Sequence, residues 1–196
     1  MRYVSSEQIN GAEQALNRGD ILATPTETVY DLVVKADNTS AIRKLLELKN
    51  RQISNRSSLT IMLADVDEIK NFAIVNHKTI NLARHYFPGE LTLILPKRRA
   101  FKHPYFDHFD EVSIRIPNHR YLLKLIRAAG PLLATNASLS GKAPCRSSKE
   151  VSAQFPTVDT AVEGISGGNL PSTIIDWTEE EPIPIRQGGL LIVRYA

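Results

Sequence analysis

Short apolar runs alternate along the chain with segments of helical period, which predicts strands and helices in turn. Strands are predicted where apolar residues run together and stop at a proline or a polar residue, at residues 21–23, 59–63, 91–95, 112–116, 131–134, 174–176, 183–185 and 190–193. Helices are predicted from apolar residues at spacings of three and four, at residues 7–18, 40–48, 65–72, 78–86, 118–130 and 147–154. This alternation favours one α/β domain over residues 1–196, with a mixed, twisted, open sheet and flanking helices.

The stretch from residue 21 to residue 51 combines two features of a binding site. Pro25 ends the first strand, and a turn with polar side chains follows it. A Thr39-Ser40 cap then begins a helix that ends at Lys49 and Arg51. Because ligands bind beyond strand ends in open α/β sheets, a polar turn and a pair of cations joined by one helix indicate a site for an anion.

Two further polar turns have the same design, which extends the hypothesis. Residues 24–30, 135–141 and 171–173 are rich in hydroxyl groups and adjoin an apolar strand. Small hydroxyls and backbone N–H groups can surround phosphate or carboxylate oxygens. Ser and Thr also occupy turns simply by bonding their own backbone, but three such turns with glycine-rich neighbours favour a ligand site.

Cations stand near these turns at the ends of predicted elements, where phosphoryl or nucleotidyl transfer would need them. They are Lys49, Arg51, Arg115, Arg146 and Arg186. Each alone is also compatible with a solvated surface charge. Arg115 is different because it interrupts a predicted strand, and a cation within a strand is expected to have a partner.

Composition excludes several classes of protein. The 196 residues are 42% hydrophobic and 23% charged, and the net charge of +3 is more typical of a solubility feature than of a nucleic-acid footprint. A single cysteine, Cys145, excludes an internal disulfide and a cysteine-based zinc site. No apolar run is long enough for a membrane span or a signal core, so we expect a cytoplasmic protein without a membrane partner.

Familiar catalytic motifs are also missing. The chain has no GxxxxGK[ST] phosphate loop, no GxGxxG, no HExxH and no GxSxG elbow. The five histidines show no metal-ligand spacing. Residues 97–109 mix basic and aromatic side chains, which is compatible with RNA binding by charge and stacking, with an active-site loop, or with plain surface.

Seven short motifs occur in the order found in the YrdC/YciO family. They are PTETVY at 25–30, Lys49-x-Arg51, PGELT at 88–92, SIRIP at 113–117, TNASLSG at 135–141, PSTIID at 171–176 and IRQG at 185–188. The chain therefore resembles the short form of this family over nearly its whole length.

The resemblance implies a YrdC-like fold and threonylcarbamoyl-AMP synthase activity. L-Threonine, bicarbonate and ATP, with Mg²⁺, would give threonylcarbamoyl-adenylate and pyrophosphate in tRNA threonylcarbamoyladenosine modification. Implied partners are tRNA or double-stranded RNA and the proteins that complete the tRNA modification.

The resemblance also assigns residues by position. L-Threonine would contact Thr28, Arg115, Thr135, Asn136 and Ser172. ATP would contact Lys49, Arg51, Asn55, Ser138, Arg146 and Arg186, with Lys49 and Arg51 as the catalytic cations and no side chain assigned to a metal.

Several positions depart from the family pattern. Asp31 and Val33 stand where the family usually has glycine, Thr60 replaces a frequent histidine, and Asn136-Ala137-Ser138 reverses the usual order of its loop. A carboxylate at Asp31 could help to hold Mg²⁺ or could repel ATP. Two alternatives therefore stay open: a YciO-type RNA-binding paralogue without full synthase activity, and a carbamoyl-transfer module like that of hydrogenase maturation proteins.

Overall fold

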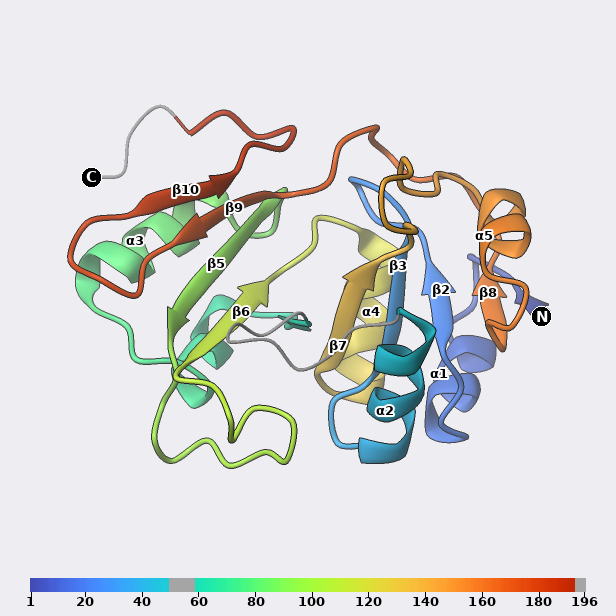
Figure 1. Ribbon diagram of the computed structural model, residues 1–196, viewed down its shortest axis with the longest axis horizontal. Helices are drawn as coiled ribbons and strands as arrows, with labels where there is room; N and C mark the ends of the chain where they lie inside the picture. Colours follow the sequence, from blue (N-terminus) through green and yellow to red (C-terminus); the bar gives the residue numbers. More distant parts are fainter. Residues whose placement is uncertain (50–58, 193–196) are drawn as a thin grey trace.

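One twisted sheet organises the computed structural model, which describes residues 1–49 and 59–192 (Figure 1). Its ten strands lie in the order β1-β8-β2-β3-β7-β4-β6-β5-β9-β10. They are β1 (Arg2–Val4), β2 (Leu22–Thr24), β3 (Asp31–Lys35), β4 (Thr60–Met62), β5 (Leu91–Pro96), β6 (Glu111–Arg115), β7 (Leu132–Asn136), β8 (Thr160–Val162), β9 (Thr173–Asp176) and β10 (Ile183–Arg186). The sheet contains both parallel and antiparallel pairs, which confirms the predicted mixed α/β architecture.

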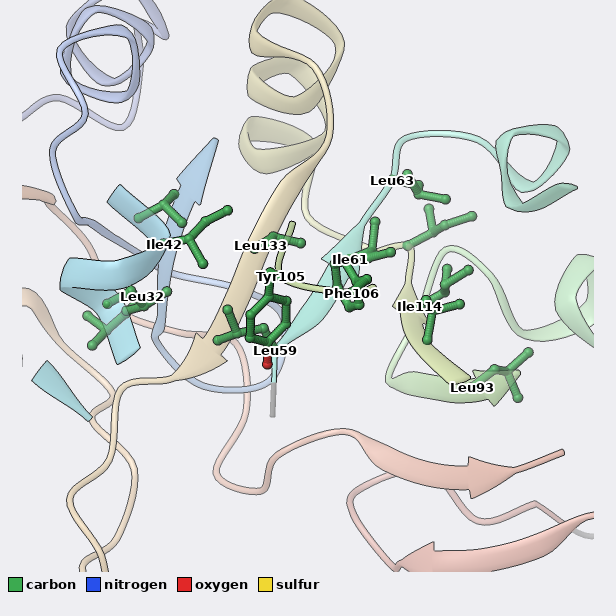
Figure 2. Packing of buried hydrophobic residues seen from close by; sticks show 14 of the residues in the cluster. Leu32, Ile42, Leu59, Ile61, Leu63, Leu93, Tyr105, Phe106, Ile114 and Leu133 are labelled. Carbon is green, nitrogen blue, oxygen red and sulfur yellow. The ribbon is translucent and has the colours of Figure 1, made fainter. Parts of the chain in front are cut away.

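Helices cover both faces of this sheet. They are α1 (Asn10–Asn17), α2 (Thr39–Leu48), the 3₁₀ helix η1 (Val66–Asn71), α3 (His77–Tyr86), α4 (Arg120–Ala129) and α5 (Ser148–Gln154). Helices α1 and α4 pack together on one face, where they cover the half of the sheet formed by β2, β3, β7 and β8. On the other face, side chains from α2 and residues 105–109 join the larger core that Figure 2 shows.

Successive residues of the central strands point to opposite faces, and this alternation separates core from site. In β4, Ile61 belongs to the larger core, whereas Met62 belongs to the core under α1 and α4. In β6, the side chain of Ile114 lies in the larger core, so Ser113 and Arg115 face the opposite side. The face opposite the larger core therefore presents polar side chains such as Ser113 and Arg115 where α1 and α4 do not cover it.

Caps fix the helix that leads to the predicted cations. The side chain of Asn38 accepts a hydrogen bond from the backbone N–H of Ala41 at 3.0 Å and so caps the N-terminus of α2. Ala41, Ile42 and Leu45 are buried against the sheet. The helix ends at Leu48 with Lys49 as its C-cap, and the Nζ of Lys49 reaches the backbone oxygen of Asn136 at the end of β7.

Some predicted elements differ from the structure. The segment 65–72 was expected to be an ordinary helix but is 3₁₀ over Val66–Asn71. The predicted strand at 190–193 is wrong for its described part, because residues 190–192 form no ladder; the backbone oxygen of Leu190 instead accepts hydrogen bonds from Thr173 and Gln187. Strands β1, β3 and β8 were not predicted. β1 and β8 have only three residues each, and β3 begins at a charged residue directly after a turn.

The aromatic rings of the 97–109 segment belong largely to the core. Tyr105, Phe106 and Phe109 are buried, and the rings of Tyr105 and Phe106 meet edge to face with their centroids 4.8 Å apart. The Nζ of Lys97 donates a hydrogen bond to the backbone oxygen of Phe106 at 2.6 Å. These three rings are therefore not available to stack on RNA bases. Among the described residues, no helix has both the length and the apolar character needed to cross a membrane.

Replacing Phe106 by alanine tests this placement. Phe106 is fully buried, so Phe106→Ala should lower the free energy of unfolding by about 3–5 kcal/mol, because a large cavity forms in the core. His108→Ala, at an exposed position in the same segment, is the control and should change stability by less than about 0.5 kcal/mol. Equal, small effects in denaturant titrations of the two variants would contradict the core assignment.

Candidate active site

A cavity of about 370 Å³ lies on the polar face of the central strands. Strands β4, β5, β6 and β7 form its floor, and the turn before β9 and the end of β10 contribute to its wall. Its polar lining residues are Asp31, Thr60, Thr92, Ser113, Arg115, Thr135, Asn136, Ser138, Ser172 and Arg186. Most of these side chains come from strands, so the scaffold holds them in place before any ligand arrives.

Arg115 is the buried cation at the centre of the site, with only 2% of its surface exposed. Its Nη2 donates to Glu27 Oε1 at 2.9 Å and to Thr28 Oγ1 at 2.8 Å. Its Nη1 lies 3.8 Å from Asp31 Oδ2. The partner expected for a cation within a strand is therefore present, and the turn after β2 supplies it.

Close backbone packing holds that turn against a second loop. The hydroxyls of Thr26 and Thr28 are 2.8 Å apart, and Thr26 donates to the backbone oxygen of Val29. The N–H groups of Gly167 and Gly168 donate to the backbone oxygens of Thr26 and Thr28, both at 2.9 Å. A Cβ on Gly167 would meet the backbone oxygen of Glu27 at 2.9 Å, so only glycine allows the two backbones to approach this closely.

Lys49 connects the end of α2 to the loop after β7. Its Nζ donates to the backbone oxygens of Asn136, at 3.0 Å, and of Ser138. The same ammonium lies 5.5 Å from the centroid of the Phe155 ring. These contacts fix the loop that contributes Asn136 and Ser138 to the cavity.

Arg186 does the same for the turn before β9. Its Nε and Nη2 donate to the backbone oxygen of Ser172, at 3.0 and 2.8 Å. The hydroxyl of Ser172 lies 2.8 Å from that of Thr92. Burial lowers the pKa of the Arg186 guanidinium, and the nearby Asp31 carboxylate opposes this shift.

Asp31 is the buried carboxylate of the cavity, with 1% of its surface exposed. Burial raises the pKa of its carboxyl from 3.8 to about 6, because desolvation disfavours the charged form; Arg115 opposes the rise and Glu27 adds to it. Asp31 Oδ1, Glu27 Oε2 and Arg115 Nε have no hydrogen-bond partner among the described residues. The site thus holds unused donor and acceptor capacity beside a cavity.

The structure brings together most of the residues that the sequence assigned. Arg115, Thr135, Asn136, Ser138, Ser172 and Arg186 line the cavity, and Lys49 contacts its loop. Thr28 is not a lining residue, but its hydroxyl accepts a hydrogen bond from Arg115, which does line the cavity. Arg146 is exposed and does not line this cavity, and its backbone N–H donates to Glu150. Arg51 and Asn55 lie outside the described residues.

Sequence reasoning missed three polar residues of the site. Glu27 pairs with Arg115, and Thr92 and Ser113 line the cavity. The signal for Thr92 and Ser113 was alternation: each is the polar residue between two apolar residues of a strand. No local signal identifies Glu27, because its partner is 88 positions away.

The raised pKa of Asp31 predicts a pH-dependent stability. The folded state binds the Asp31 proton more tightly than the unfolded state, so this group makes the protein less stable as pH rises from about 3.8 to about 6. Asp31→Asn, which carries no charge, should therefore raise the free energy of unfolding by about 1–3 kcal/mol at pH 7.5 and have little effect below pH 4.

Denaturant titrations at several pH values measure this difference. Asp37→Asn is the control, because Asp37 is exposed and only 3.7 Å from Lys35 in a surface ion pair; its effect should stay below about 1 kcal/mol. A destabilising effect of Asp31→Asn at pH 7.5 would show that the charged carboxylate is favoured in the folded protein.

Comparison with proteins of known sequence reveals long, continuous similarity. Threonylcarbamoyl-AMP synthase of Bacillus subtilis is 34% identical over 191 residues, which are 93% of this chain and 54% of that protein. Threonylcarbamoyl-AMP synthase of Escherichia coli O157:H7 is 33% identical over 181 residues, 88% of this chain and 93% of that protein. The chain spans about half the length of the relatives from B. subtilis and Pyrococcus abyssi, 54% and 52%.

Solved structures agree on the fold. Sua5 of P. abyssi, complexed with L-threonine, superposes with a TM-score of 0.85 and is 30% identical, covering 96% of this chain and 57% of that one. E. coli YciO superposes with a TM-score of 0.83 at 23% identity, covering 96% and 95% of the two chains. A sequence model of the Sua5/YciO/YrdC family, described as telomere recombination, matches residues 14–188. The chain therefore belongs to the Sua5/YciO/YrdC family.

Proposed function

We propose that this chain is a nucleotidyltransferase, a threonylcarbamoyl-AMP synthase that converts L-threonine, bicarbonate and ATP into threonylcarbamoyl-AMP and pyrophosphate. The observation that carries the proposal is one cavity that unites cations with hydroxyl-rich turns, in a chain 33% identical to a synthase that it matches over 93% of that protein's length. We also propose that residues 1–196 form a single YrdC-like domain that acts in the cytoplasm.

Positioning and charge neutralisation supply the catalysis in this proposal. The threonine nitrogen attacks bicarbonate-derived CO₂ to form a carbamate, a carbamate oxygen attacks the α-phosphorus of ATP, and pyrophosphate leaves. Negative charge grows on the phosphate oxygens and the leaving group, so cations near them stabilise the transition state. Lys49, Arg186 and Ser138 would face the ATP phosphates, together with Arg51, Asn55 and Arg146, which sequence alone assigns.

L-Threonine would bind deeper on the sheet. Arg115, Thr135, Asn136 and Ser172 surround that part of the cavity, and Thr28 acts behind Arg115. Mg²⁺ enters this proposal as part of the Mg²⁺–ATP substrate, since it binds mainly to phosphate oxygens and retains water. The described residues contain no cluster of three His, Cys, Asp or Glu side chains that could hold a metal by themselves.

The downstream partners follow from the product. A threonylcarbamoyl group activated on AMP has to be passed to an acceptor, which we propose is tRNA held by further tRNA-modification proteins. The alternative, an RNA-binding paralogue without full synthase activity, loses support because the rings of Tyr105, Phe106 and Phe109 are buried.

Pyrophosphate release tests the proposal directly. Purified protein with ATP, Mg²⁺ and bicarbonate should release pyrophosphate when L-threonine is present and only at background rate without it. L-Serine at the same concentration serves as a comparison for the amino-acid substrate. Release of pyrophosphate that does not depend on threonine would reject the synthase assignment. No release of pyrophosphate, with RNA binding retained, would reject it in favour of the RNA-binding paralogue.

The assigned phosphate cations provide a second test. Lys49→Ala and Arg51→Ala should each weaken ATP use by about 1.5–3 kcal/mol, the scale of a lost charge-assisted hydrogen bond. Arg43→Ala, an exposed cation on α2, is the matched control and should leave ATP use unchanged. Wild-type ATP affinity in both test variants would refute the assigned phosphate site.

A further inference from the structure

Asp31 is the one carboxylate among the described residues that line the cavity. It is the first residue of β3, where it pairs with Asn136 of β7, another lining residue. Within β3, Val33 belongs to the core under α1 and α4 and Leu32 to the larger core on the opposite face. Alternation therefore puts the Asp31 side chain on the face that carries the cavity.

The carboxylate of Asp31 is buried without full satisfaction. Its Oδ1 has no hydrogen-bond partner among the described residues, and its Oδ2 lies 3.8 Å from Arg115 Nη1, too far for a hydrogen bond. A buried carboxylate oxygen without a hydrogen bond is costly to a fold, so the position of Oδ1 beside a cavity suggests a ligand that donates to it. The ligand group has to be a hydrogen-bond donor, such as a hydroxyl or an amine, or a metal ion that the oxygen coordinates, because an anion would be repelled.

The charge of Arg115 next to Asp31 limits which class of ligand fits the cavity. Arg115 is buried next to Asp31, and its Nε also has no hydrogen-bond partner among the described residues. An unused cationic donor and an unused carboxylate side by side match a ligand whose own carboxylate and ammonium are close together. In an α-amino acid a single carbon atom separates these two groups, so a zwitterion can meet both residues at once.

We propose that Asp31 recognises the amino group of the amino-acid substrate, and that its Oδ1 accepts a hydrogen bond from the ammonium while Arg115 faces the substrate carboxylate. This inference rests on the proposed function, since it names how the same cavity selects its amino acid. Asp31 thus sets specificity for an α-amino acid over an otherwise identical acid that lacks the α-amino group.

Holding the amine at Asp31 also orients the nitrogen that reacts. The carboxylate pairs with the ammonium of the incoming substrate. Before the nitrogen attacks CO₂, the ammonium gives one proton to water; as the N–C bond forms and a C=O π bond opens, the nitrogen gives a second proton to water, which leaves a carbamate with one N–H. The remaining N–H can still donate to Oδ1, but the charge pairing is lost. Asp31 therefore binds the substrate more strongly than the carbamate that the first step forms.

Calorimetric titrations with and without the substrate amine test the inference. The ligands are L-threonine and its deaminated analogue (R)-3-hydroxybutyrate, added at pH 7.5 in EDTA without ATP. Wild-type protein should bind L-threonine at least about tenfold more tightly than the analogue, since a charge-assisted hydrogen bond is lost. Asp31→Asn should bring the two affinities within about threefold, mainly by weakening L-threonine binding.

Glu27→Gln is the matched control. Glu27 pairs with Arg115 at 2.9 Å but does not line the cavity, so its loss should weaken both ligands by a similar factor and preserve their ratio. A role of Asp31 that is only structural would likewise change both affinities together. The ratio between the ligands is therefore the informative readout, and thermal melts confirm that each variant is folded.

The remaining outcomes separate this inference from the proposed function. An unchanged ratio in Asp31→Asn overturns the inference, and so does L-threonine binding that appears only when Mg²⁺ replaces EDTA, which would assign Asp31 to a metal. Wild-type protein that shows the expected ratios but releases no pyrophosphate supports the inference and contradicts the synthase. A wild-type chain that binds no L-threonine overturns both.

Discussion

The site depends on the pairing of the buried Arg115 guanidinium with Glu27 and Thr28. A charge in a protein interior is stable only when partners compensate it, and removing one partner of such a pair typically costs about 3–5 kcal/mol. Glu27 and Thr28 provide this compensation from a turn that is far away in the sequence. The hydrogen bonds to Arg115 therefore hold the turn after β2 against the middle of the sheet. Moving this turn away would leave a buried charge unpaired and would destabilise the fold.

The same central strands serve two environments, because side-chain direction alternates along them. Leu93 and Ile114 pack into the larger core that Figure 2 shows, whereas Thr92, Ser113 and Arg115 face the cavity. A core residue is thus the immediate neighbour of each polar lining residue, and packing on one face restrains side chains on the other. Lys49 and Arg186 hold the neighbouring loops in place through hydrogen bonds to the backbone oxygens of Asn136 and Ser172.

Sequence patterns identified most of the fold and part of the site, and the differences have physical causes. Longer apolar runs such as residues 91–95 are strands as predicted, because four of these five residues are apolar and all five are buried. β3 was missed because its first residue is Asp31, a poor strand former that directly follows a polar turn. A partner for Arg115 was predicted from the residues around it, but its identity depends on tertiary contacts that no local pattern contains.

Among the described residues that line the cavity, Asp31 is the one acidic side chain, beside Arg115, Arg186 and several hydroxyl groups. Lys49, Arg115 and Arg186 all lower the pKa of its carboxyl, yet desolvation outweighs them and the pKa remains raised. Burial thus works against the charged form of Asp31, although its Oδ2 lies 3.8 Å from the buried Arg115 guanidinium, and its Oδ1 has no hydrogen-bond partner among the described residues. Natural sequences keep such conflicts mainly at functional sites. This conflict is the basis of the proposed role of Asp31, because a ligand that carries a positive charge next to its own carboxylate would pair with Asp31 and with Arg115 at once.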